Sequence, residues 1–175
     1  KTAYEIPKRD LEFRRVLFRS PSMFAKRHGE KNKPIYPELR DGELCITWIG
    51  HASFLIQTPE HSILIDPNWA KWLKVIKRLR QPGIEIHDLP AIDLVLVTHA
   101  HFDHLDRKTL RAVASDQAIV VPEHVGGLVH GLGFNQVQEL KQWEKFEIGD
   151  LKVTLTPARH WGARVLHDSH RGFGG

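Results

Sequence analysis

The residues with the clearest capacity for chemistry lie in one short run, Thr98-His99-Ala100-His101-Phe102-Asp103-His104, which holds three histidines and one aspartate. Neutral imidazole nitrogens and carboxylate oxygens are the ligands that zinc and iron take in proteins. The run directly follows the apolar stretch 93–97, so a loop leaving a buried strand can bring these side chains to one place. The sequence therefore predicts a metal site in this loop.

The spacing within the run divides its ligands into two groups. Residues two apart in an extended segment point the same way, so His99 and His101 can bind one ion. Asp103 and His104 follow on a tightening turn and face a neighbouring ion. The first ion needs a third histidine, and His160 is the best candidate because it stands just beyond a predicted strand. If that strand neighbours the strand before His99, both sets of ligands leave the same edge of a sheet.

Two further polar residues stand near predicted strand ends. Asp66 ends an apolar strand, where its carboxylate can accept a hydrogen bond from a ligand histidine and fix the tautomer of that ring. The alternative is an ordinary aspartate in a turn. His51 follows Gly50 and either lines the pocket or only completes a turn, and the sequence leaves both questions open.

The elements that must position these residues form a mixed α/β layered domain. Asp106 is placed to cap a helix over about 107–114, and a weaker helical pattern covers 124–132. Short apolar runs bounded by turn residues predict strands over 44–49, 53–57, 62–65, 93–98, 118–121, 136–140, 145–148 and 152–156.

Residues 69–80 predict a basic amphipathic helix, because apolar side chains recur at helical spacing and lysines and arginines cover the remaining surface. Such a helix can rest on anionic headgroups, so peripheral membrane contact through 69–80 is one expectation. The alternative is an apolar face packed on the sheet with the lysines in solvent. The sequence has no run of about 20 apolar residues, and the expected location is cytoplasmic, with or without this membrane contact.

Residues 1–40 differ from the rest of the chain in charge and pattern. They hold 11 Lys and Arg against 5 Asp and Glu and show no sustained period, which predicts a basic, poorly ordered arm before one domain over 41–175. Leu17-Phe18-Arg19-Ser20 matches the translation of a common sequencing adapter, so residues up to about 20 are interpreted as an assembly artefact, with a short basic helix as the alternative. The arm carries a charge of +6 and residues 41–175 carry −2, which together give the net charge of +4, so nucleic-acid binding is not expected.

The motif from His99 to His104 has the His-x-His-x-Asp-His pattern and resembles the metallo-β-lactamase-fold hydrolases. Within them, the chain looks most like the branch that contains N-acyl-phosphatidylethanolamine phospholipase D. The segments that carry this likeness are Trp48–Ser53, Leu64–Pro67, His104–Asp106 and Thr156–Trp161. The resemblance covers about 43–175 and implies an αββα sandwich, truncated so that mainly its first αβ half is present.

The resemblance also implies how the ligands divide. It makes His99, His101 and His160 the ligands of one metal, and Asp103 and His104 ligands of the second. Zinc is the expected ion, two per intact domain, with iron or manganese as alternatives. The family's bridging aspartate and last histidine ligand are expected beyond the final residue. Asp103 is also expected to orient the attacking hydroxide, which makes it the predicted catalytic residue.

These features predict a zinc-dependent hydrolase that uses a metal-bound hydroxide on a phosphodiester of a phospholipid or small molecule. A lactonase or other ester hydrolase of the same fold is the alternative, because pocket walls rather than the motif select the substrate. A non-catalytic metal-binding fragment is the alternative from another class. The chain by itself is expected to be inactive and marginally stable, since half of the implied sandwich lies outside it. No oligomeric state is predicted.

Overall fold

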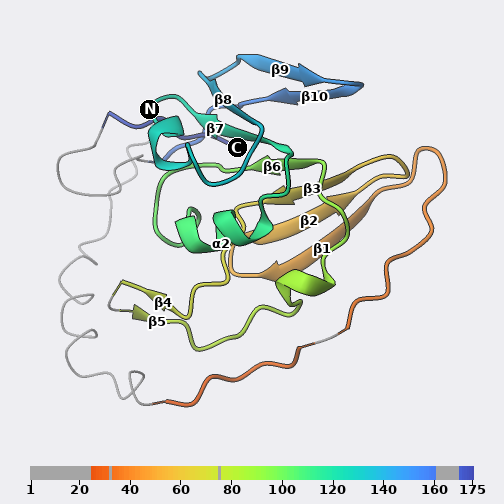
Figure 1. Ribbon diagram of the computed structural model, residues 1–175, viewed down its shortest axis with the longest axis vertical. Coiled ribbons are helices and arrows are strands. Elements are labelled where there is room, and N and C mark those ends of the chain that lie inside the picture. The colour runs from red at the N-terminus through yellow and green to blue at the C-terminus, as the bar shows by residue number, and fades with distance from the viewer. Residues whose placement is uncertain (1–24, 32, 75, 161–169) are drawn as a thin grey trace, which may run out of the picture.

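The computed structural model describes residues 25–31, 33–74, 76–160 and 170–175. Within these residues, six strands form the main sheet in the order β1-β2-β3-β6-β7-β8 (Figure 1). Neighbouring strands among β1, β2 and β3 are antiparallel, and those from β3 through β8 are parallel. The bounds are β1 Cys45–Gly50, β2 Ser53–Gln57, β3 Ser62–Ile65, β6 Leu94–Leu96, β7 Ala118–Pro122 and β8 Gln136–Leu140. The sheet thus combines an opening meander with parallel strands, as a mixed α/β domain requires.

The burial of the strands follows their place in the sheet. β7 is buried at all five positions, which suits a central parallel strand covered on both faces. β2 instead alternates between buried and half-buried residues, the pattern of a strand with one covered face. The strands predicted over 53–57, 62–65, 136–140 and 145–148 are confirmed at their exact bounds, and the others differ by a few residues at their ends.

The helix α2, Arg107–Val113, covers one face of the sheet (Figure 1). The larger of two buried apolar clusters, called the larger core below, lies on this face. The Asp106 carboxylate accepts hydrogen bonds from the Thr109 N–H at 3.0 Å and from the Thr109 hydroxyl at 2.7 Å, which confirms the predicted cap. Leu110 and Val113 of α2 pack in this core with Ile119 of β7. The helix therefore begins shortly after the metal-type motif. Its packing ties the C-terminal end of that motif to the sheet.

The opposite face of the sheet carries a second, smaller core. The hairpin of β9, Lys145–Ile148, and β10, Leu151–Thr154, lies over it as a separate two-stranded sheet (Figure 1). Leu94 and Val120 point to this side, while Val95 of the same strand as Leu94 points to the larger core. Alternate residues of the parallel strands therefore hold two apolar layers on one sheet.

The described part of 69–80, which leaves out residue 75, does not form the predicted helix, and that prediction is wrong. β4, Trp72–Leu73, pairs with β5, Ile76–Lys77, in a short antiparallel hairpin set apart from the main sheet (Figure 1). The Arg78 N–H donates to the Lys71 carbonyl at 3.0 Å and closes the base of the hairpin.

Long-range contacts explain why the hairpin replaces the helix. The Trp69 N–H donates to the Thr109 hydroxyl at 2.9 Å, so the start of the segment is tied to α2 rather than to a following helical turn. Trp69 packs against the larger core, whereas Trp72 and Ile76 are exposed, so the apolar residues share no buried face. Lys74 has φ +55°, a left-handed conformation that ends a right-handed helix.

The helical pattern over 124–132 yields only the 3₁₀ turn η3, Gly126–Leu128, where Gly126 packs against Glu139 too closely to accept a Cβ. A second 3₁₀ turn, η2, covers Ile86–Asp88. The longer helical prediction over 124–132 is therefore wrong, because successive glycines favour a tight turn over a regular helix.

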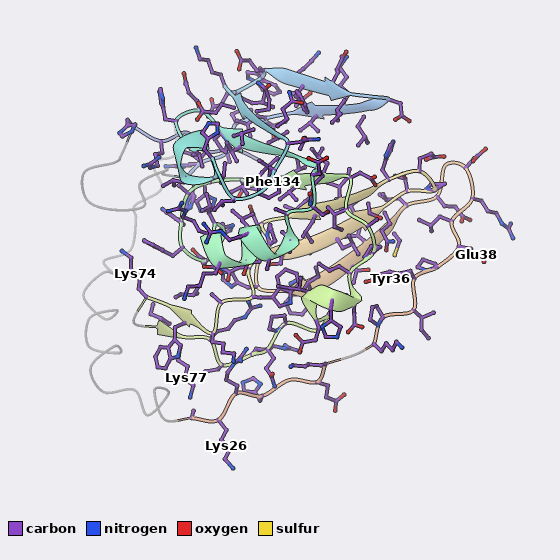
Figure 2. All side chains as sticks on the ribbon, viewed as in Figure 1. Lys26, Tyr36, Glu38, Lys74, Lys77 and Phe134 are labelled. Carbon is purple, nitrogen blue, oxygen red and sulfur yellow. The ribbon has the colours of Figure 1, made fainter. Side chains whose placement is uncertain are left out.

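Residues 25–31 and 33–40 contain no helix or strand and lie along the domain. The Tyr36 hydroxyl donates to the Asp88 carbonyl at 2.7 Å, and Tyr36 packs against the larger core (Figure 2). The His28 N–H donates to the Leu79 carbonyl at 2.8 Å. The adapter-like segment lies outside the described residues, and the domain boundary near residue 41 stays a prediction.

Candidate metal centre

The loop that follows β6 brings three histidines to one point. His99 Nε2 lies 3.0 Å from His101 Nδ1 and 3.0 Å from His160 Nε2, and His101 Nδ1 lies 3.3 Å from His160 Nε2. His99 is buried, His101 is half-buried and His160 is exposed. The three side chains therefore face a common point near the surface.

Hydrogen bonds cannot satisfy this triangle of nitrogens. Each ring nitrogen is either a donor or an acceptor, so at least two of the three are in the same state and repel each other. A cation at the centre removes the conflict, because each nitrogen can then offer it a lone pair. Zinc–nitrogen bonds of about 2.0–2.1 Å at tetrahedral angles separate two nitrogens by about 3.3 Å, close to the observed spacing. The donor set and its dimensions thus fit a divalent metal ion.

His160 reaches this point from a strand that is not beside β6. β10 belongs to the separate β9–β10 hairpin, so the expected shared edge of one sheet is not observed. An extended segment instead links the two regions: the Gly174 N–H donates to the Thr98 carbonyl at 3.1 Å, and Gly175 and Thr156 exchange backbone hydrogen bonds at 2.8 and 3.1 Å. Backbone pairing across this segment therefore brings His160 to His99.

Asp66 sets the tautomer of His99 through one intervening hydroxyl. The Thr98 hydroxyl donates to Asp66 Oδ2 at 2.7 Å and contacts His99 Nδ1 at 2.9 Å. Since that hydroxyl has already used its only proton, His99 Nδ1 must carry the proton of the second bond. The lone pair of His99 then lies on Nε2, the atom that faces the other two histidines.

The same carboxylate holds His104 directly. His104 Nδ1 lies 2.7 Å from Asp66 Oδ2, so its proton is donated there and Nε2 is left with the lone pair. Asp66 is almost completely buried and also accepts the Thr98 N–H on Oδ1 at 2.7 Å. One buried carboxylate therefore orients a histidine from each predicted ligand group.

His99 of the first group and His104 of the second have opposite pKa shifts. Burial, with repulsion from the neighbouring His104, His101 and His160, lowers the pKa of His99 to about 3, so this ring is neutral at pH 7. Burial also acts to lower the pKa of His104, but the hydrogen bond and charge of Asp66 and the charge of Asp103 outweigh it and raise the pKa.

The second group consists of His51, Asp103 and His104, whose ligand atoms lie within 4.8 Å of one another. Asp103 Oδ2 lies 2.8 Å from His51 Nε2 and 3.6 Å from His104 Nε2. The pKa of Asp103 is lowered overall. Burial acts to raise it, but the hydrogen bond to His51 and the charge of His104 outweigh burial, so the carboxylate is ionised. An ionised carboxylate beside two imidazoles is also a set of ligands for a divalent cation.

Local strain turns His51 toward this group. β1 is irregular between Trp48 and Gly50, and Gly50 has φ +138°, a conformation that suits a residue without a Cβ. His51 follows with φ +55°, and its carbonyl accepts a 2.8 Å hydrogen bond from Trp48 Nε1. The turn therefore aims the His51 ring across the sheet edge at Asp103.

The structure brings together all five residues that the sequence singled out as ligands, His99, His101, Asp103, His104 and His160, in two adjacent groups. It adds His51 to the second group, which the sequence left as a pocket or turn residue. Asp66 accepts a hydrogen bond from a candidate ligand histidine, which is the role that the sequence left open for it. Two features of the sequence could have indicated these roles. For His51 it is the glycine that precedes it, and for Asp66 it is the position at the end of a predicted strand.

A protein-family model, the β-lactamase superfamily domain, matches residues 61–173. The chain belongs to this superfamily. The superfamily match includes the complete run from His99 to His104 and also His160. A solved structure from Parabacteroides distasonis, described as a metal-dependent hydrolase, is 28% identical and superposes with a TM-score of 0.51 over 66% of this chain and 46% of its own. The expected metallo-β-lactamase fold is thereby confirmed.

Curated relatives place the chain within a group of longer proteins. An uncharacterized protein of Mycobacterium tuberculosis is 33% identical over 70% of this chain and 36% of its own length. An N-acyl-phosphatidylethanolamine-hydrolyzing phospholipase D of Caenorhabditis elegans is 31% identical over 75% of this chain and 42% of its own length. The superfamily chain described here thus spans between a third and a half of the length of these relatives.

Proposed function

We propose that the protein is a metal-dependent hydrolase that binds two divalent ions, one in each histidine group. The observation that carries the proposal is the closeness of the groups: the His99 and His104 ring centroids lie 4.0 Å apart. Two-metal hydrolytic sites hold their ions about 3.5–4 Å apart, which requires adjacent ligand sets of this kind. Zinc is the proposed ion because imidazole dominates both groups, and iron or manganese are the alternatives.

Around such a centre, different residues of the chain would bind the ions, orient the attacking water and fix the tautomers of the histidines. A bound divalent ion would lower the pKa of water toward neutrality and polarise the bond under attack. His99, His101 and His160 would hold the first ion, and Asp103 and His104, joined here by His51, would hold the second. Asp103 would also accept a hydrogen bond from the attacking water and orient it. Asp66 keeps His99 and His104 in the tautomers that this task needs.

The proposed substrate is a phosphodiester. The motif resemblance and the relative named as a phospholipase D support this choice. Lys74 and Lys77 of the β4–β5 hairpin carry positive charge that suits a substrate with phosphate groups, and Lys26 lies on the segment whose Ala25 carbonyl contacts Lys77 (Figure 2). Hydrolysis of a carboxylic ester or lactone is the second candidate, since the same centre can polarise a carbonyl. A non-catalytic metal-binding role is the third.

A substrate panel tests the proposal on the longest available gene product, alongside this chain. Metal content is measured first, and rates are then compared for bis(4-nitrophenyl) phosphate, a long-chain phospholipid diester and an acyl lactone. We expect about two ions per chain in the longer product, and faster hydrolysis of the diesters than of the lactone. Preferred lactone hydrolysis would favour the second candidate, and metal binding without turnover would favour the third. That this chain alone is inactive stays a prediction, which the side-by-side assay checks.

The β4–β5 hairpin supports a peripheral membrane contact in place of the predicted helix. Trp72 and Ile76 are exposed on the hairpin, and Lys71 and Lys74 are exposed beside them. An apolar surface bordered by lysines suits an anionic lipid surface. No helix among the described residues is long and apolar enough to cross a bilayer. Co-sedimentation with vesicles that contain anionic lipid should fall when Lys71 and Lys74 are changed to glutamate, and unchanged binding would reject this contact.

A further inference from the structure

A cavity of about 350 Å³ lies beside the candidate metal centre. His51 forms part of its wall, and His51 Nε2 contacts the Asp103 carboxylate at 2.8 Å. One side chain therefore stands between this cavity and the second ligand group. The other lining residues come from β1, from the β4–β5 hairpin and from the chain around it: Trp48, Gly50, Asn68, Leu73, Arg78, Arg80 and Gln81.

Arg78 is held in place at the wall of this cavity. Its Nη1 donates to the Asn68 carbonyl and its Nε donates to the Arg80 carbonyl at 3.0 Å, and the side chain is half-buried. A Cβ at position 50 would lie 3.1 Å from Arg78 Nη2, so Gly50 leaves the room that the guanidinium occupies. These two hydrogen bonds fix the guanidinium, which makes Arg78 a pre-organised cation.

The positive charge of the cavity is not balanced by acidic groups. Its lining includes two arginines and no carboxylate. Among the described residues, no aspartate or glutamate forms an ion pair with Arg78 or Arg80. Burial and repulsion from Arg27 lower the pKa of Arg78, so the cation is held in surroundings that oppose its charge. An anion that enters the cavity relieves this cost and forms charge-assisted hydrogen bonds.

The apolar part of the wall indicates what the anion is attached to. Trp48 and Leu73 line the cavity with the arginines, and the Arg80 guanidinium carbon lies 5.4 Å from the Trp48 ring centroid. A guanidinium stacked on an aromatic ring presents its N–H groups in one plane, which matches the oxygens of phosphate or carboxylate. A free inorganic ion would leave the Trp48 and Leu73 surfaces uncovered.

We propose that this cavity binds an anionic oxygen group of the substrate, a phosphate or carboxylate joined to an apolar moiety, through Arg78 and Arg80. It holds that group beside the metal centre while a different bond of the same molecule is hydrolysed. The inference rests on the proposed hydrolase function, because it assigns the cavity to the substrate of that centre. It narrows the substrate to molecules with a negative charge besides the bond that is cleaved.

Calorimetric titration of phenylphosphonate into the metal-loaded chain tests this proposal, because the probe joins an anionic group to an aromatic ring and has no hydrolysable ester. The R78M/R80M double variant should bind it about tenfold or more weakly, since it loses the charge-assisted hydrogen bonds. Arg111→Met, a change at an exposed arginine of α2, is the matched control and should bind as the wild type does. The neutral dimethyl ester of the probe should bind weakly to all three proteins.

Further measurements distinguish binding in the cavity from binding to the metal ions and from a loss of folding. Unchanged affinity in R78M/R80M, with binding lost in H99A/H101A, would show that the ions alone bind the probe and would overturn the proposal. R80M alone removes an exposed side chain and should still weaken binding, which excludes an effect of misfolding through Arg78. The affinity for benzoate, compared with that for phenylphosphonate, shows whether the cavity prefers a carboxylate or a phosphate-like group. Arginine-dependent binding without phosphodiester turnover would reject the proposed reaction but keep the anion cavity.

Discussion

The two histidine groups of the candidate centre are adjacent but built on different principles. The group of His99, His101 and His160 contains only imidazole nitrogens, and its buried member has a pKa lowered to about 3. The group of Asp103, His104 and His51 contains an ionised carboxylate, and its histidine His104 has a raised pKa. A set of three imidazoles with one buried, neutral member thus lies beside a set that contains an ionised carboxylate. The difference follows from the two carboxylates that face His104, Asp66 directly after β3 and Asp103 in the loop, since burial alone lowers the pKa of both His99 and His104.

Removal of two ligands from the first group should have the largest effect. In H99A/H101A two of three converging nitrogens are lost, so we expect metal content to fall by about one ion per chain and hydrolysis by the longer gene product to disappear. Inductively coupled plasma spectrometry on dialysed protein measures this loss. His130→Ala, at an exposed histidine, is the control and should keep the full metal content. Full metal content in the double variant would show that the first group is misassigned.

Loss of the charge on Asp66 should affect both groups together. Asp66→Asn keeps the shape of the side chain but weakens its bonds to the Thr98 hydroxyl and to His104. We expect metal affinity to fall by about 10–100-fold, the usual effect of removing a partner that orients a ligand. Competition with a zinc-binding dye measures the affinity, and Asp41→Asn, at an exposed aspartate, is the control. A loss confined to one group would show that Asp66 supports only that group.

Removal of His51 should weaken only the second group. His51→Ala deletes the ring that contacts Asp103 at 2.8 Å but leaves His99, His101 and His160 intact. We expect about tenfold weaker binding of the second ion and no change for the first, because the remaining Asp103 and His104 form a poorer set. Stepwise calorimetric titration with zinc separates the two events. His87→Ala, at a largely exposed histidine, is the control, and equal weakening of both ions would contradict the division into groups.

Acid should change the stability of the metal-free protein in opposite directions through His99 and through His104. The folded pKa of His99 is below its unfolded value of about 6.5, so the unfolded chain binds the proton first and stability falls as pH drops from about 6.5 toward 3. The folded pKa of His104 is raised, so its contribution is present below about pH 6.5 and is lost as pH rises through the folded pKa. Urea unfolding of H99Q and H104Q against the wild type should show these opposite slopes, with the smaller effect at His104, where solvent screens a partly exposed group. Parallel pH curves for the two variants would contradict the assignment.

Much of the fold and of the ligand set could be predicted because the signals are local. The strands over 53–57 and 62–65 are set by the order of apolar residues, and the Asp106 cap acts on a helix that begins at the next residue. The candidate ligands from His99 to His104 are close in the chain, so a single loop conformation brings them together. The prediction of a helix over 69–80 failed because its apolar spacing did not correspond to one buried face.

By itself, the sequence determined the loop that carries the metal-type ligands, the strand before it and the helix after it, because neighbours in the chain interact whatever the rest of the fold does. Only the tertiary structure decided three further features. It brought His160 to His99 through an extended segment, it turned His51 toward Asp103 after Gly50, and it placed Asp66 against histidines of both groups. Each of these contacts joins residues that are far apart in the chain. Their geometry therefore depends on how strands and loops close around a common core, which residue spacing does not encode.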